Sequence, residues 1–122
     1  MNNSKDKLEI IMKMQDLLNA KVGLSQEEAM KMPLEERMKW IRKYLQALIV
    51  EIAEVFEETG YKWWKSKDIN EEALKEELID ALHFLLSAML LAGMNAEEVF
   101  KVYVKKNEKN FTRKDWDVNK EE

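Results

Sequence analysis

Two pairs of acidic residues stand in stretches of sequence that are otherwise apolar. Glu51 and Glu54 follow the apolar run 47–50, and Glu77 and Asp80 precede the run 81–86. The members of each pair are three residues apart, so on a helix both carboxylates lie on one face. An ionised carboxylate among apolar neighbours is costly unless a cation or hydrogen bonds compensate it. The pattern therefore predicts a cation site, and Mg²⁺ is the first hypothesis because it prefers hard oxygen ligands.

The two pairs can act together if their helices face each other. At 100° per residue, Glu77 and Asp80 fall within an arc of about 80°. Glu51 and Glu54 occupy a similar arc on the preceding helix. Four carboxylates at such close range predict more than one Mg²⁺, or one ion and a second that arrives with a substrate. The alternative is a solvated acidic face that pairs with lysines such as Lys62, Lys65 or Lys75.

Two further groups of residues suit a nucleotide. Trp63 and Trp64 sit among lysines, and an aromatic wall beside ammonium groups can bind a base and a phosphate. The tryptophans can equally fill the end of a helical bundle or a dimer interface. Gln15 and Asn19 lie four residues apart on the inner stripe of the first helix, where carboxamides can read the edge of a base. They can also simply hydrogen-bond to neighbouring helices.

A basic segment and one histidine complete the candidates. The stretch 105–113 combines cations with amides and suits a polyphosphate, although cations are also favoured at any helix end. His83 follows Asp80 by three residues and is a candidate substrate contact, or a structural hydrogen-bonding group. No glycine-rich phosphate loop and no Ser/His/Asp set is present, so phosphate chemistry has to use metal and cations.

Composition sets the class of protein. The 122 residues are enough for a single domain, expected to span 1–122 with a polar tail from about residue 115. The net charge of −4 argues against nucleic acid as a partner, and the absence of cysteine excludes disulfides and thiolate sites. The N-terminal residues lack a signal-peptide core, and no apolar run is long enough to cross a bilayer. We expect a cytoplasmic protein without a membrane partner.

The positions of the glycines, the proline and the helix-capping residues predict only helices. A first helix ends near Gly23, Ser25 opens a short second segment, and Pro33 begins a long third helix that stops at Gly60. A fourth helix runs from about Asn70 to Gly93 and is apolar almost all round from residue 78, so it should be the most buried element. Asn95 begins a fifth helix that frays near residue 111. The expected fold is an all-α bundle of about five helices, completed by homodimerisation.

Five short motifs in this order resemble one known family. The motifs are Gln15-Asp-Leu-Leu-Asn19, Glu51-Ile-Ala-Glu54, Tyr61-Lys-Trp-Trp-Lys65, Glu77-Leu-Ile-Asp80 followed by Ala-Leu-His-Phe84, and Lys106-Asn107-Glu-Lys-Asn110-Phe-Thr-Arg113. Together they are similar to the dimeric dUTPase branch of the all-α nucleoside triphosphate pyrophosphohydrolases, the superfamily of the MazG-like enzymes. The resemblance covers residues 8–116. The chain departs from the family after the last motif, where a glycine- and tyrosine-bearing segment is often found.

The resemblance implies a function and a role for each motif. It implies Mg²⁺-dependent hydrolysis of dUTP to dUMP and pyrophosphate, with two or more ions held by Glu51, Glu54, Glu77 and Asp80. One of the glutamates, Glu51 or Glu54, would take the proton of the attacking water. Base and sugar would meet Gln15, Asn19, Trp64, His83 and Phe84. Phosphates would meet Lys65, Lys106, Asn107, Asn110 and Arg113, across a homodimer interface.

Three other readings of the same residues remain open. The first is a MazG-like or dCTP-directed pyrophosphohydrolase on the same scaffold. The second is a helical dimer that binds a nucleotide without turning it over. The third is a structural bundle whose acids pair with lysines. Pyrophosphate release from each deoxynucleoside triphosphate, with and without Mg²⁺, separates these readings.

Overall fold

The computed structural model describes residues 6–113, and every regular element in that range is a helix. The five helices are α1 (Lys7–Val22), α2 (Gln26–Lys31), α3 (Leu34–Glu58), α4 (Glu71–Leu91) and α5 (Ala96–Phe111). The all-α prediction is therefore confirmed, and the predicted helix limits agree with the structure to within a few residues. The expected polar tail from residue 115 lies outside the described residues.

Side-chain caps explain where most of the helices begin. Asp6 accepts from the backbone N–H of Leu8 at the start of α1, and Ser25 accepts from that of Glu28 at the start of α2. Asn70 and Asn95 cap α4 and α5 in the same way. Each cap satisfies a backbone donor that has no partner inside its helix. Pro33 precedes α3 without a side-chain cap.

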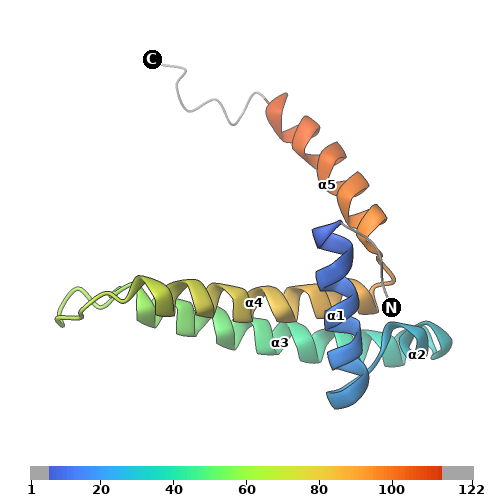
Figure 1. The fold of residues 1–122 in the computed structure, drawn as a ribbon, viewed down its shortest axis with the longest axis horizontal. Coiled ribbons are helices and arrows are strands. Elements are labelled where there is room, and N and C mark those ends of the chain that lie inside the picture. The colour runs from blue at the N-terminus through green and yellow to red at the C-terminus, as the bar shows by residue number, and fades with distance from the viewer. Residues whose placement is uncertain (1–5, 114–122) are drawn as a thin grey trace.

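The long helices α3 and α4 form an antiparallel pair that carries the rest of the chain. They lie side by side over most of their length, and residues 59–70 connect them at one end (Figure 1). Near the other end α1 crosses α4, and α2 lies beside the end of the pair (Figure 1). This arrangement brings residues of α1 next to residues of α4 that are more than 60 positions away in the sequence.

The core lies where the C-terminal half of α4 meets α1, α2 and the start of α5. One cluster contains Met12, Leu86, Leu90 and Ala96, and a second contains Leu24, Ala29 and Leu91. The expectation that α4 is the most buried helix holds for its C-terminal half. It fails for its N-terminal half, because Leu78 and Ile79 are 51% and 52% exposed in the isolated chain.

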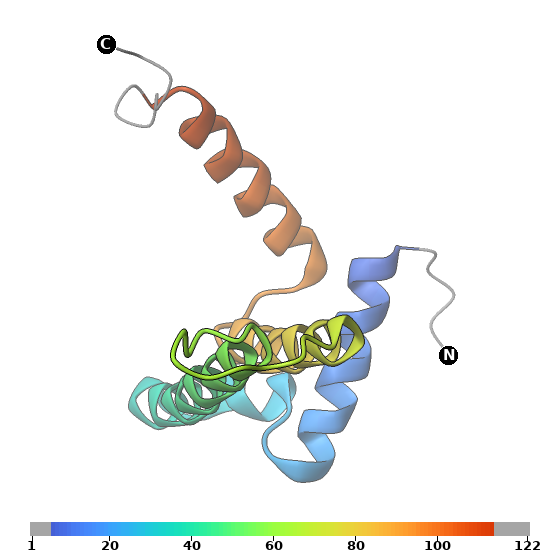
Figure 2. The same ribbon diagram turned by 90° about the vertical axis from the view of Figure 1, so that its left-hand side faces the viewer.

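The fifth helix projects from the rest of the described chain. It points away from the α3–α4 pair in both ribbon views (Figures 1 and 2). Gly93, with φ of 94°, forms the bend between α4 and α5. The large side chains of Phe100, Tyr103 and Phe111 on α5 are 60%, 70% and 83% exposed. The single chain is therefore an open assembly of helices and not a closed five-helix bundle.

Among the described residues, no helix taken singly has the length and apolar composition needed to cross a membrane. The pair α4 and α5 reaches that length and composition only when taken together, and the two helices are bent by 103° where they join.

Candidate metal and nucleotide site

The acidic pairs of α3 and α4 meet across the helix pair. Glu51, Glu77 and Asp80 each offer one carboxylate oxygen, and these three oxygens lie within 4.8 Å of one another. Glu51 and Glu77 are half-buried, whereas Asp80 is exposed. Glu54 is also exposed, and it lies close enough to affect the ionisation of both glutamates. The four predicted acids therefore form one cluster, as their helical spacing indicated.

The surroundings of the cluster disfavour the ionised form of its carboxyl groups. Burial raises the pKa of Glu51 above its ordinary value, and repulsion from Glu54 and Asp80 raises it further. The pKa of Glu77 is raised by burial first, and then by repulsion from the other three acids. Both effects destabilise the ionised carboxylates, and a bound cation would reverse them.

One carboxylate oxygen of the cluster lacks a partner in the described part of the chain. Oxygen Oε1 of Glu77 is buried and has no hydrogen-bond partner within the described part of the chain. The ion pairs found among residues 6–113 involve other acids, for example Glu57 with Lys62 at 3.7 Å and Glu58 with Lys67 at 3.9 Å. Lys75 pairs with Glu72. Pairing with lysine therefore does not account for the cluster in this structure, and the clustered carboxylate oxygens fit a divalent cation such as Mg²⁺.

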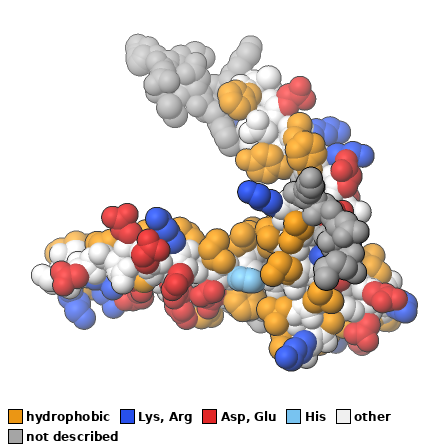
Figure 3. All heavy atoms as spheres, viewed as in Figure 1, with side chains coloured by type: hydrophobic (Ala, Val, Ile, Leu, Met, Phe, Trp, Pro, Cys, Tyr) orange, Lys and Arg blue, Asp and Glu red, His pale blue; other side chains and the backbone are white. Residues whose placement is uncertain are grey.

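An apolar cavity of about 520 Å³ lies between α1 and α4, and one of its lining residues, His83, follows Asp80 by one helical turn. Its polar lining residues are Gln15 and His83, and its apolar lining consists of Ile11, Met14, Leu18, Ile79, Leu82 and Leu86. His83, the only histidine of the chain, lies between acidic and apolar side chains on the surface (Figure 3). The volume and the lining suit an aromatic base with its sugar.

Gln15 and His83 belong to a hydrogen-bonded chain that runs from the exposed His83 into the protein interior. The ring nitrogen Nδ1 of His83 lies in hydrogen-bonding contact with Oε1 of Gln15. Nε2 of Gln15 donates to Oδ1 of Asn19 at 3.0 Å. The hydroxyl of Ser87 lies 3.2 Å from the same Asn19 oxygen and 2.9 Å from the backbone oxygen of His83. Gln15, Asn19 and Ser87 are 5%, 2% and 1% exposed, so this polar network lies inside the interface of α1 and α4.

Ser87 is the member of this network that sequence analysis left out of the site. A signal for it was available, because Ser87 interrupts an apolar run four residues after His83. It also lies on the side of α4 that carries Glu77 and Asp80. The spacing alone could not show that α1 supplies its partner.

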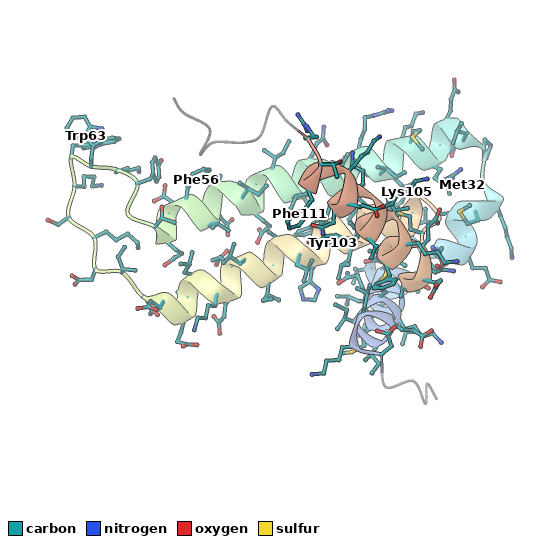
Figure 4. The ribbon with its side chains drawn as sticks, turned by 90° about the horizontal axis from the view of Figure 1, so that it is seen from above. Met32, Phe56, Trp63, Tyr103, Lys105 and Phe111 are labelled. Carbon is teal, nitrogen blue, oxygen red and sulfur yellow. The ribbon has the colours of Figure 1, made fainter. Side chains whose placement is uncertain are left out.

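Three further predicted residues, Phe84, Trp64 and Lys65, do not line this cavity in the single chain. Phe84 packs against Tyr44, with ring centres 6.4 Å apart, and does not line the cavity. Trp64 stacks edge-on against Trp63 in the connection between α3 and α4, at the tip of the helix pair (Figure 4). These tryptophans do not fill the end of the isolated chain, because they are 58% and 88% exposed. Lys65 lines a small lysine-rich hollow in the same connection.

The basic motif of α5 is also remote from the tryptophan loop. Tyr103, Lys105 and Phe111 of α5 lie far from Trp63 (Figure 4). Helix α5 carries Lys106, Asn107 and Asn110, and Arg113 follows its end. The helix itself points away from the α3–α4 pair, which carries the acids (Figure 1).

Comparison with known proteins supplies the family. A family model described as dUTPase matches residues 7–92, which include both acidic pairs and the Gln15/Asn19 motif. A dCTP pyrophosphatase of Enterobacteria phage T4 is 38% identical over 77 residues, which cover 63% of this chain and 39% of that protein. A dCTP pyrophosphatase of Enterobacteria phage LZ5 is 29% identical over 140 aligned positions, covering 90% of this chain and 81% of that protein.

A DNA replication protein of phage T4 is also similar, with 36% identity over 69 residues, but only 15% of its length is covered. No solved structure matches the chain significantly. The family model covers well over half of the chain, including the helices that form the acidic cluster and the cavity. This chain therefore belongs to the dUTPase family.

Proposed function

We propose that this protein hydrolyses a pyrimidine deoxynucleoside triphosphate, with dUTP as the first candidate, to the monophosphate and pyrophosphate. One observation carries the proposal: in a member of the dUTPase family, α4 carries both part of a carboxylate cluster and His83, which lines an apolar cavity of nucleoside size. One oxygen of that cluster is buried without a hydrogen-bond partner among the described residues. The acidic cluster suits a metal-bound polyphosphate, and the cavity suits the nucleoside attached to it.

In this proposal the acidic cluster holds Mg²⁺ and prepares the attacking water. Glu51, Glu54, Glu77 and Asp80 would bind two or more ions. Bound Mg²⁺ would neutralise charge on the phosphate oxygens and favour in-line attack by water. Glu51 would accept the proton of that water, with Glu54 as the other candidate.

The cavity would bind the nucleoside. Gln15 and Asn19 would recognise the base, and His83 would contact the base or sugar from the mouth of the cavity. Phe84 would support the cavity indirectly, by packing against Tyr44. It would contact the base or sugar only if binding changes its position. Trp64 would pack against the base only if its loop reaches the cavity, and a second copy of the chain can supply that loop.

We also propose that the working unit is a homodimer. Helix α3 is 25 residues long and strongly amphipathic, yet none of its residues is buried in the single chain. Ile49, Val50 and Phe56 on this helix are 66%, 57% and 54% exposed. A second copy would cover such an apolar surface. The phosphate-binding role expected for Lys65, Lys106, Asn107, Asn110 and Arg113 would then be performed across the interface.

A second candidate substrate is dCTP. Both phage relatives named above as pyrophosphatases carry dCTP in their names, and one of them aligns with 90% of this chain. The acidic cluster would serve either substrate equally, because both carry the same triphosphate. Only the groups that meet the base distinguish the two candidates.

Pyrophosphate release tests the proposal directly. Purified protein is incubated with each deoxynucleoside triphosphate, with Mg²⁺ and with EDTA, and pyrophosphate and monophosphate are quantified. The proposal expects Mg²⁺-dependent release from dUTP, dCTP or both, and little from purine substrates. Thermal stabilisation by dUTP without pyrophosphate release would instead identify a nucleotide-binding protein that lacks turnover. If neither pyrophosphate release nor thermal stabilisation by dUTP is observed, the protein would be a structural bundle without nucleotide binding.

A further inference from the structure

The end of α4, where the chain bends toward α5, is completed by side chains from two other helices. The last four carbonyl groups of a helix have no partner inside it, so they need partners elsewhere. Backbone N–H groups just after α4 satisfy the carbonyls of residues 88 and 89. The side chain of Gln26, on α2, donates to the oxygen of Leu90 at 2.9 Å. That of Arg37, on α3, donates to the oxygen of Leu91 at 3.1 Å.

Gln26 also joins the two sides of the bend. Its nitrogen Nε2 donates to the backbone oxygen of Leu90, in α4, and to that of Met94, beyond the bend, each at 2.9 Å. An amide nitrogen carries two hydrogens, so this one group supplies both hydrogen bonds. Gly93, which lies between the two acceptors, is the residue with φ of 94°. A single side chain therefore ties the last turn of α4 to the residues that lead into α5.

The position of Gln26 is fixed in turn by α1. Its backbone N–H lies in the first turn of α2, where it has no partner within the helix, and donates to Oδ1 of Asp16 at 2.8 Å. A carboxylate at a helix N-terminus is also favoured by the helix dipole. Asp16 and Gln26 are both half-buried, which reduces competition from water. Helix α2 therefore connects α1 to the bend between α4 and α5.

The bend matters because α5 is long and is anchored near its base. Ala96 and Val99 pack into the core, whereas Phe111 at the far end is largely exposed. A helix of 16 residues is about 24 Å long, so a change of about 20° at its base would move its far end by about 8 Å. Hydrogen bonds to phosphate oxygens form only at distances of about 2.7–3.2 Å. The direction set at the bend therefore decides which phosphates the basic motif of α5 can reach.

We propose that Gln26 is a positioning residue for the triphosphate, because its amide fixes the bend and so sets the direction of the basic motif of α5. The inference rests on the proposed function, since it takes this motif as the part of the chain that binds phosphates. Gln26 does not line the cavity between α1 and α4. A change at Gln26 should therefore weaken binding of the triphosphate and leave binding of the nucleoside unaffected.

Gln26→Glu tests this role because it keeps the shape of the side chain and removes both donors. An ionised glutamate would also place an oxygen against two backbone oxygens, which repel it. KM for the better of dUTP and dCTP should rise by at least about tenfold, as expected for the loss of one charge-assisted hydrogen bond to phosphate. The Kd of the matching deoxynucleoside, which carries no phosphate, should be unchanged.

A distance measurement reads the direction of α5 without any activity. The chain contains no cysteine, so spin labels can be attached at Glu108→Cys on α5 and Lys39→Cys on α3, two exposed positions. Labelled chain is diluted into unlabelled chain, so that double electron–electron resonance reports distances within one chain. Gln26→Glu should shift or broaden the distance distribution by about 5 Å or more, because a small rotation at the base of α5 is amplified along the helix.

Two further variants complete the test. Gln46→Glu makes the same chemical change at an exposed position of α3, one turn after Arg42 and Lys43, and should leave KM and the distance unchanged. Gln26→Met removes both donors without adding charge, and should reproduce the effects of Gln26→Glu. If Gln26→Glu does not fold, as judged by circular dichroism, Gln26→Met decides.

The outcomes separate the inference from the proposed function. A natural chain that binds the triphosphate but releases no pyrophosphate would contradict the proposed function, and the distances and the two affinities would still test the inference. Unchanged distances in the Gln26 variants, or equal losses of affinity for triphosphate and deoxynucleoside, would overturn the inference. A changed distance without weaker binding of the triphosphate would overturn it as well, because the bend would then not position the basic motif for phosphates.

Discussion

At the scale of single residues, the acidic cluster is the feature on which the proposed chemistry depends. Its carboxylates come from two helices, and the structure places one oxygen from each of Glu51, Glu77 and Asp80 within 4.8 Å of the others. Because Oε1 of Glu77 has no hydrogen-bond partner among the described residues, the cluster is costly without a cation. This cost gives the cluster measurable consequences for both activity and stability.

Neutralising one member of the cluster should abolish hydrolysis. Asp80→Asn and Glu54→Ala remove a proposed metal ligand without disturbing the core, so each should lower kcat/KM by at least about 100-fold while helicity by circular dichroism is unchanged. Glu76→Gln is the matched control, because Glu76 is an exposed acid one residue before Glu77. Full activity in Asp80→Asn would remove Asp80 from the metal site.

The cluster should also make stability depend on pH. A carboxyl whose pKa is higher in the folded than in the unfolded chain stabilises the fold at low pH, and this contribution is lost as the pH rises through the folded-state pKa. The pKa values of Glu51 and Glu77 are raised by burial and by the neighbouring acids. Without metal, the Tm should therefore increase as the pH falls from neutral toward the raised pKa values.

Scanning calorimetry in EDTA and in Mg²⁺ checks this expectation. Mg²⁺ should raise the Tm near neutral pH and reduce its dependence on pH, because the cation stabilises the ionised carboxylates. Glu51→Gln should show a smaller change of Tm with pH than the natural chain in EDTA. Identical pH profiles for the two proteins would exclude Glu51 as a source of the effect.

At the scale of elements, the bend between α4 and α5 determines where the basic helix points. Gly93 adopts φ of 94°, a left-handed conformation that disfavours other residues. A Cβ atom at this position would lie 3.1 Å from Cε and 3.3 Å from Sδ of Met30. The direction of α5 is therefore encoded by a backbone conformation and by the close approach of α2.

Replacing this glycine should destabilise the fold. Gly93→Ala should lower the free energy of unfolding by about 1–2 kcal/mol, measured by urea denaturation, because alanine is strained in the left-handed region. Gly93→Asn introduces the same Cβ but tolerates that conformation better, so it should lose less stability. Equal losses in the two variants would assign the effect to the contact with Met30 and not to the backbone.

At the scale of the whole molecule, the single chain leaves one face of its longest amphipathic helix exposed. None of the 25 residues of α3 is buried, and α5 exposes Phe100, Tyr103 and Phe111 as well. The hydrophobic effect favours covering such surfaces, and the proposed pairing with a second copy would do so.

Sedimentation equilibrium should therefore give twice the chain mass of 14.5 kDa. Ile49→Lys places a charge on the uncovered face of α3, where Ile49 is 66% exposed in the single chain, and should shift the equilibrium toward monomer with loss of activity. Glu72→Lys introduces the same side chain at a position whose side chain is already 86% exposed, and should remain dimeric. A natural chain that is monomeric and active would contradict the dimer proposal.

The sequence by itself determined the helices, their caps and the sharing of one face by each acidic pair. These features are local, because caps, glycines and the 3.6-residue period act within a few positions. The order of the motifs likewise pointed to the family, whose model matches residues 7–92. Gln15 and Asn19 were predicted as site residues because they lie on one stripe of the first helix and belong to the first of these motifs.

Only the tertiary structure decided which helix faces which. Periodicity fixes where a side chain lies around its own helix axis, but not the partner across the interface. The crossing of α1 over α4 joined Asn19 to Ser87, a partner 68 positions away, and set Gln15 beside His83. The turn at Gly93 carried the basic motif of α5 away from the acids of its own chain (Figure 1). Contacts between distant residues depend on the packing of whole helices, which no local pattern in this sequence specifies.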